Sequence, residues 1–255
     1  MSYLGDKDFQ FEIAKGNVAG HKSVNKFGRN TNVDATVTDI WDLTTQPIWV
    51  APTQARTHDI ASTSTNDDGS PAGTGAQTLR VSGLTGWDAN EVTEDITLNG
   101  TTNVPTVNSY VIIHRMQVLT WGSAGPNAGT LTATAQTDAT VTAQINIGAG
   151  QTEMAIYGVP STQKAYMTQY YAGVRASGPS GNIFGELLVN SYADTELTNF
   201  LVKHSFSRVT TAPTTPHEFH SPAEFAGPCI IKIQATGSTV NLEVDAGFDL
   251  ILVDN

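Results

Sequence analysis

Hydrophobic and polar residues alternate with a period of two along much of the chain. Residues 77–84 (QTLRVSGL), for example, place Leu79 and Val81 on one face. Such alternation is typical of strands with one buried face. Residues 110–119 (YVIIHRMQVL) have few polar interruptions, which predicts a strand covered on both faces. Further strands are predicted over residues 91–98, 130–135, 152–159, 164–174, 182–189, 200–209, 229–235 and 240–253.

Helical patterns are scarce. No window of eleven or more residues combines apolar i, i+3, i+4, i+7 positions with caps at both ends. The predicted strands are separated by clusters of Gly, Pro, Asn and Ser at intervals of roughly 8–15 residues, which is typical of sandwiches and barrels. We therefore expect an all-β fold, an antiparallel β-sandwich or jelly-roll-like structure of one or two β units, with an extended N-terminal arm.

Three segments interrupt the strand pattern. Residues 1–35 show no clean periodicity and are interpreted as the N-terminal arm, and residues 61–76 (ASTSTNDDGSPAGTGA) as a long polar loop. Residues 136–150 are rich in Gln, Thr, Ala and Gly and could form a linker. These interruptions predict a first β unit at 36–135 and a second β-sandwich unit at 136–255, although one interleaved body fits the pattern almost as well.

The arm combines apolar and basic residues, and we expect it to contact a partner. Residues 1–30 contain five basic and three acidic residues, a net charge of +2, so the rest of the −11 chain carries −13. Apolar side chains would supply most of the affinity, and charged side chains would steer the encounter. The predicted partner-contact residues are Phe9, Phe11, Lys22, Lys26, Phe27 and Arg29. An ordinary first strand with a frayed end is the alternative interpretation.

The composition excludes several classes of protein. Charged residues make up 15% of the chain, against about 25% in an average soluble domain, and 35 threonines accompany only 13 Lys and Arg residues. Direct nucleic-acid binding through a basic surface is not expected, because phosphate contacts need clustered Lys and Arg. We expect no membrane segment, since the longest uncharged stretch, residues 116–137, is rich in Thr, Gly, Ser and Asn.

Candidate metal and nucleophile sites are few. His217 and His220 lie three apart between prolines, so they would point to opposite faces of an extended segment. Asp67-Asp68-Gly69 could help to hold Ca²⁺, but an Asp/Gly turn needs no ion. Cys229, the single cysteine, begins an apolar run and is interpreted as a buried strand thiol. No Walker A motif or GxSxG elbow is present, and we expect no metal and no cofactor.

Carboxylates and aromatic residues offer the remaining candidate chemistry. Glu91, Glu94 and Asp95 form the densest acidic cluster, which is better explained as a solvated strand end than as an acid/base pair. A second set of residues, which could line a sugar platform but is better explained by core and interface packing, is Tyr166, Tyr170, Tyr171 and Phe184. We therefore expect no catalytic residues and no enzymatic activity.

Four stretches carry a resemblance to a known family: residues 20–28 (GHKSVNKFG) with the Ile40-Trp41-Asp42 triplet, residues 83–101, residues 150–166 and residues 246–253 (AGFDLILV). In these stretches the chain resembles uncharacterised virion structural proteins of tailed bacteriophages, notably marine podoviruses and siphoviruses. The resemblance spans nearly the whole length. None of its motifs is catalytic, so it concerns the role of the protein in a particle and not a reaction mechanism.

The resemblance and the composition together predict a bacteriophage virion structural protein. We expect a head decoration (cement) protein or a head–tail (neck) component that acts by protein–protein contacts. A receptor- or polysaccharide-binding module on the head or tail is the alternative. The expected partners are other copies of the chain, with a trimer favoured, and the major capsid or other virion proteins. The expected location is the virion, assembled in the host cytoplasm.

Overall fold

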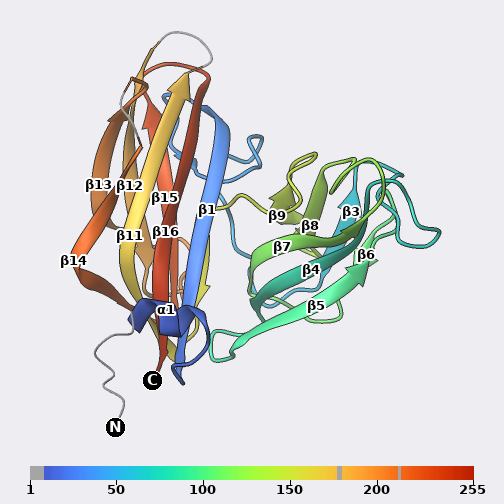
Figure 1. Ribbon diagram of the computed structural model, residues 1–255, viewed down its shortest axis with the longest axis horizontal. Helices are drawn as coiled ribbons and strands as arrows, with labels where there is room; N and C mark the ends of the chain where they lie inside the picture. The colour runs from blue at the N-terminus through green and yellow to red at the C-terminus, as the bar shows by residue number, and fades with distance from the viewer. Residues whose placement is uncertain (1–8, 177–179, 212–213) are drawn as a thin grey trace.

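The computed structural model describes residues 9–176, 180–211 and 214–255. Within these ranges the chain consists almost wholly of antiparallel strands, with one short helix, α1 (Phe9–Ala14). The strands gather in two lobes, seen at the left and right of Figure 1. We call them the body, which contains β1, β2 and β10–β16, and the inserted lobe, which contains β3–β9. The prediction of an all-β, antiparallel fold is confirmed.

The body contains two sheets. The first has the order β1 (His21–Val33), β16 (Leu242–Asp254), β11 (Gln163–Ala176), β14 (Thr215–Ala226). The second has the order β10 (Ile156–Val159), β15 (Cys229–Gly237), β12 (Asn182–Asn190), β13 (Leu201–Val209), and β2 (Thr38–Asp39) pairs with β15. Apart from β2, the body has eight strands within the described ranges. In chain order the first pairs with the last, the second with the seventh, the third with the sixth and the fourth with the fifth.

One apolar core lies between the two sheets of the body. Met167, Tyr170 and Phe248 reach it from the first sheet, and Leu187 and Ile233 reach it from the second. Each of these side chains is at most 1% exposed. Burial alternates along much of β16 because successive side chains of a strand point to opposite faces. The body is therefore held together by apolar burial between the two sheets and by the strand pairings within each sheet.

The inserted lobe also consists of two sheets. One has the order β6 (Val104–Pro105), β3 (His58–Ser62), β8 (Leu131–Ala135), β9 (Thr140–Ile145). The other has the order β5 (Glu91–Thr97), β4 (Ala76–Leu84), β7 (Ile112–Trp121). A second apolar core fills this lobe and includes Ile60, Leu79, Ile112, Met116 and Leu131. The chain enters the lobe after β2 and leaves it before β10.

The two cores meet at β15. Ile231 and Ile233 belong to the core of the body, whereas Ile230 belongs to the core that fills the inserted lobe. The first five residues of β15 are all buried. The outer face of this sheet is therefore partly covered by the inserted lobe, which explains why an uninterrupted apolar run forms a strand here.

The described part of the predicted N-terminal arm is not an arm. Residues 1–8 lie outside the described residues, α1 follows them, and the rest of the segment contributes β1, which pairs with β16 from His21↔Val253 to Val33↔Leu242. The strand pattern was hidden because polar residues occupy inward positions. Lys26 and Asn30 are buried, and they donate to the backbone carbonyls of His114 and Asp39.

The predicted boundary between residues 135 and 136 is also misplaced. It falls inside the hairpin of β8 and β9, where Ala135 pairs with Thr140. The predicted linker at 136–150 contains β9 itself. The chain is interleaved instead: β1 and β2 begin the body, residues between β2 and β10 build the inserted lobe, and β10–β16 complete the body. Because the paired strands lie far apart in the sequence, no local pattern of residues indicates this nested order.

Candidate functional site

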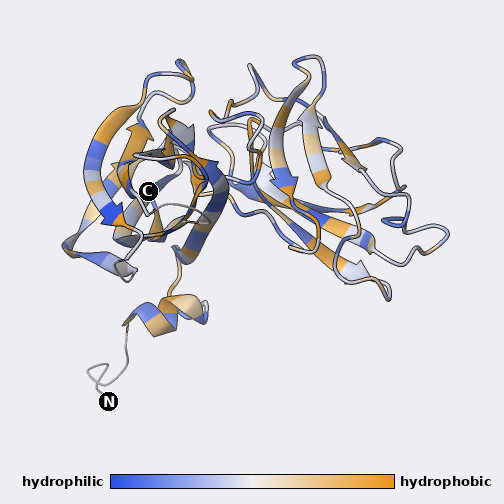
Figure 2. Cartoon of the chain, turned by 90° about the horizontal axis from the view of Figure 1, so that it is seen from above, coloured by the Kyte–Doolittle hydropathy of each residue, from blue (hydrophilic) through white to orange (hydrophobic). Residues whose placement is uncertain are grey.

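Two of the six predicted partner-contact residues are exposed on α1. Phe9 is 58% exposed and Phe11 is 60% exposed, while Ile13 on the same helix is buried. The Phe9 ring contacts the His21 ring edge to face, with ring centroids 5.9 Å apart, and the Lys15 ammonium lies 5.2 Å from the Phe11 ring centroid. Figure 2 shows α1 projecting from one side of the body. The helix thus presents two aromatic rings to solvent.

The other four predicted contact residues lie on β1 and are engaged within the chain. Lys22 Nζ donates to Glu91 Oε1 at 2.9 Å, and Lys26 is only 2% exposed. The Phe27 ring lies under the Arg115 guanidinium at 5.9 Å. Arg29 pairs with Glu243 on β16. These residues therefore connect β1 to the inserted lobe and to its neighbouring strand.

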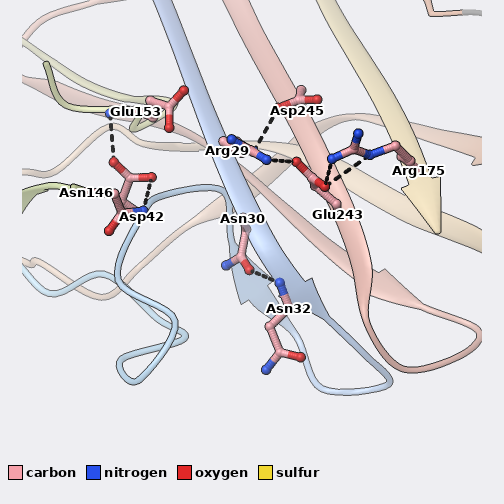
Figure 3. Close-up of polar contacts among 9 residues, drawn as sticks. All are labelled: Arg29, Asn30, Asn32, Asp42, Asn146, Glu153, Arg175, Glu243 and Asp245. Carbon is pink, nitrogen blue, oxygen red and sulfur yellow. Dashed lines mark hydrogen bonds and ion pairs between the residues drawn. The ribbon is translucent and has the colours of Figure 1, made fainter. Parts of the chain in front are cut away.

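Arg29 belongs to a charged row that crosses three strands of the first sheet (Figure 3). Glu243 on β16 pairs with Arg29 on β1 and with Arg175 on β11, and Asp245 lies 3.9 Å from Arg29 Nε. Although burial opposes its ionisation, the two guanidinium groups hold the pKa of Glu243 below its usual value. The row is a cross-strand ion-pair network and offers no reacting group.

A carboxyl pair lies beside this row, where the chain crosses between the lobes (Figure 3). Asp42 Oδ1 accepts from Asn146 Nδ2 at 2.9 Å, and Asp42 Oδ2 accepts from the backbone N–H of Glu153 at 3.3 Å. Burial, together with the Glu153 charge, raises the pKa of Asp42 to about 8. The Asp42 carboxyl is therefore protonated at neutral pH. Among the described residues, no nucleophilic side chain forms a hydrogen bond with it.

The predicted acidic cluster on β5 is dispersed over three separate contacts. Glu91 accepts from Lys22 Nζ and, at 3.3 Å, from the Tyr157 hydroxyl. Glu94 Oε2 accepts from the backbone N–H groups of residues 107 and 108. Asp95 forms a bidentate pair with Arg80 at 2.7 and 2.8 Å. No two of these carboxylates are arranged as an acid/base pair.

The other sequence candidates have structural partners. Asp67 is fully buried and accepts from Ser62 Oγ and from three backbone N–H groups, so both of its oxygens are occupied. His217 stacks on Tyr170, whereas His220 is exposed. Burial raises the pKa of the Cys229 thiol to about 12. Among the described residues no group of three or more His, Cys, Asp and Glu side chains could hold a metal ion.

The four aromatic residues considered as a sugar platform do not form one. Tyr170 is buried in the body core and its hydroxyl lies 2.6 Å from His204 Nδ1. Tyr166 donates to Glu224 at 3.1 Å, and the Tyr171 hydroxyl lies where a side chain on Gly247 would be. Phe184 is exposed, but it lies on β12 of the other sheet. The packing interpretation describes these residues better than the sugar platform.

An apolar groove of about 520 Å³ was not predicted. It runs between residues 48–53 and the outer face of the second sheet of the body, and its lining includes Ile48, Val50, Leu188 and Val202. Ile48, Val50 and Val202 are exposed. The sequence feature that could have indicated the groove is the run Pro47-Ile48-Trp49-Val50-Ala51-Pro52. An apolar run between two prolines is too short for a core strand, so its side chains are candidates for an exposed surface.

A buried ion pair lies on the floor of this groove. Lys232 Nζ donates to Asp39 Oδ2 at 2.8 Å and lies 4.4 Å from the ring centroid of Phe200. The Asp39 side chain is fully buried, and burial raises its pKa even though Lys232 and the backbone N–H of Trp49 oppose that shift. The pair fixes β2 and residue 49 against β15, so it shapes the groove.

Comparisons with known proteins identify no family. No family model matches the chain, and no curated protein matches it. One solved structure that matches is that of T=1 particles derived from infectious bursal virus, with 9% identity, a TM-score of 0.27, and coverage of 92% of this chain and 70% of that chain. A similarity of that size carries no argument about function. No helix within the described residues is long and apolar enough to cross a membrane.

Proposed function

We propose that this chain is a structural protein of a bacteriophage particle and that its body is a jelly roll. The nested pairing of eight strands, first with last through fourth with fifth, in two facing sheets is the order of a double-sheet jelly roll. This architecture occurs in capsid and lectin domains. Because a fold hosts many functions, the fold alone does not carry the proposal.

The observation that carries the proposal is a pair of exposed apolar surfaces. One is α1, on which the Phe9 and Phe11 rings are both exposed, and the other is the groove lined by Ile48, Val50 and Val202. Exposed apolar surface of this kind is typical of sites that contact another protein. The resemblance of residues 20–28 and 246–253 to virion structural proteins supports a particle as the place of that contact.

The mechanism that we propose is attachment. The body supplies the packed core, and α1 extends two aromatic anchors toward a neighbouring subunit. Contacts of this kind serve a head decoration or cement protein, or a component of the neck. Repetition about a particle axis makes a cyclic homo-oligomer the expected assembly, with the trimer favoured. No catalytic step, metal or cofactor is part of the proposal.

Quantitative mass spectrometry of purified particles tests the proposal. The chain should be present in many copies per particle, in a fixed ratio to the major capsid protein, and should remain after washing in high salt because apolar contacts are not screened. Absence of the chain from purified particles would contradict the proposal.

Polysaccharide or receptor binding is the second candidate. Trp121 and Tyr192 are more than half exposed, and such rings can stack on sugars. Glycan-array screening separates the two functions: selective glycan binding that is lost on Trp121→Ala or Tyr192→Ala would favour the receptor-binding role. A blank array, together with fixed copy number in the particle, would favour the structural role.

A further inference from the structure

A polar cavity lies at the seam between the two lobes. Its volume is about 280 Å³. β1 of the body lies on one side and β7 of the inserted lobe on the other. The charged and ring-bearing side chains in its lining are Lys22, Lys26, Glu91, His114, Arg115 and Tyr157. Three cations and one carboxylate line this cavity, on a chain whose overall charge is −11.

Lys26 is a buried lysine without a carboxylate partner among the described residues. Its ammonium donates to the backbone carbonyl of His114 at 2.5 Å, and it forms no ion pair within 4.0 Å. The other buried lysine, Lys232, has the Asp39 carboxylate at 2.8 Å. Burial, and then the charge of Arg115, lowers the pKa of Lys26 well below its usual value. A buried ammonium needs an anion nearby to be stable in its charged form.

The one carboxylate in the cavity is already engaged. Glu91 accepts from Lys22 Nζ at 2.9 Å and from the Tyr157 hydroxyl at 3.3 Å. The Glu91 charge also favours the charged form of Lys26, but one carboxylate balances only one of the three cations in the lining. Arg115 donates to the backbone carbonyl of Asn25 at 2.6 Å, which uses one of its five N–H groups.

His114 adds a neutral donor. The backbone N–H of Gly158 donates to His114 Nδ1 at 3.3 Å, so the ring proton lies on Nε2. Among the described residues His114 Nε2 is buried without a hydrogen-bond partner, and the carboxylate oxygen Glu91 Oε2 lies 3.9 Å away. Burial lowers the pKa of His114 to about 3. A buried N–H group without a partner is destabilising, and a bound acceptor would remove that cost.

We propose that this seam cavity binds a small oxyanion of the phosphate or sulfate class. The Lys26 ammonium, the Arg115 guanidinium and the His114 Nε2–H group are its donors. The two uncompensated cations match a dianion, and the cavity is large enough for one tetrahedral ion with water. Lys26 comes from the body, whereas His114 and Arg115 come from the inserted lobe. The bound ion therefore joins the two lobes and stabilises their relative placement.

The test is a titration of the full chain with inorganic phosphate at constant ionic strength, with chloride replacing phosphate. Binding is measured by calorimetry, and the unfolding temperature is measured in parallel. The chain should bind phosphate at one site, and its unfolding temperature should rise and then saturate as the site fills. Sulfate should behave alike, and acetate, a monoanion, should bind more weakly. Absence of saturable phosphate binding, or acetate binding at least as tight, would overturn the proposal.

Variants locate the site. Lys26→Met keeps the length of the side chain and removes a desolvated charge, so the variant should fold while its phosphate affinity falls roughly tenfold or more. Arg115→Gln should weaken phosphate binding in the same direction. The control is Lys164→Met, which removes a surface lysine that is paired with Glu224 and does not line the cavity. Equal affinity in Lys26→Met and in the unmodified chain, or an equal loss in Lys164→Met, would refute a site at the seam.

Discussion

The backbone N–H of Glu153 donates to Asp42 Oδ2 at 3.3 Å and joins the segment that enters the inserted lobe to the segment that leaves it (Figure 3). The adjacent residues reinforce this junction, since Trp41 forms a β-bridge with Met154. Asn146, which follows β9, donates to the other Asp42 oxygen at 2.9 Å. The Asp42 side chain therefore fixes the connection between the lobes.

Stability should fall as pH rises through the neutral range because of Asp42. Its folded-state pKa of about 8 lies above the value of 3.8 expected for an unfolded chain. Between these values the folded chain holds a proton that the unfolded chain releases, so raising the pH favours unfolding. The free energy of unfolding should fall by up to about 4 kcal/mol between pH 5 and pH 8. Urea unfolding at the two pH values measures it.

Asp42→Asn isolates this contribution from other titrating groups. In this variant the free energy of unfolding should fall much less between pH 5 and pH 8 than in the unmodified chain. Asp194→Asn, at an exposed position, should behave like the unmodified chain. The same decline in Asp42→Asn as in the unmodified chain would show that another group is responsible.

The ion pair between Lys232 and Asp39 should be costly to break from one side. Lys232→Met leaves the buried Asp39 carboxylate without its cation, and the free energy of unfolding should fall by about 3–5 kcal/mol. The double variant Lys232→Met/Asp39→Asn removes both charges and should recover much of that loss. Denaturant unfolding of the unmodified chain, Lys232→Met, Asp39→Asn and the double variant measures the coupling. Additive losses would show that the two charges do not stabilise each other.

The two exposed rings of α1 should matter for assembly and not for folding. Phe9→Ser/Phe11→Ser should change the free energy of unfolding by less than about 1 kcal/mol, because both rings are exposed. The variant should nevertheless fail to join the particle or the homo-oligomer. Val107→Ser is the matched control, since Val107 is 91% exposed on the inserted lobe. Light scattering and particle binding measure the difference, and normal assembly of the double variant would rule out α1 as an anchor.

Strand positions were predictable where apolar residues alternate or run without interruption. Each strand expected from such a pattern overlaps an observed strand, as β4 does around Leu79 and Val81. Two long strands, β1 and β14, were missed because Lys26 occupies an inward position in β1 and because Pro216 and Pro222 interrupt β14, and the shorter β3 and β9 were missed as well. A local pattern carries no information about β1 pairing with β16, more than 200 residues away.

The candidate surfaces were predictable only in part. The sequence marked Phe9 and Phe11 as apolar anchors, and both are exposed. The sequence also predicted that Lys26 contacts a partner protein. In the fold this lysine points into the seam between the lobes, where its neighbours come from β7 and β10. The apolar groove was missed because β12, β13 and residues 48–53 form it only after the chain has returned to the body.

Cryo-electron microscopy of the particle tests the central claim most directly. The reconstruction should contain the two-lobed chain in many symmetry-related copies, with α1 or the apolar groove buried against a neighbouring subunit. A reconstruction that accounts for the whole particle without this chain, or that leaves both surfaces exposed in every copy, would contradict the account.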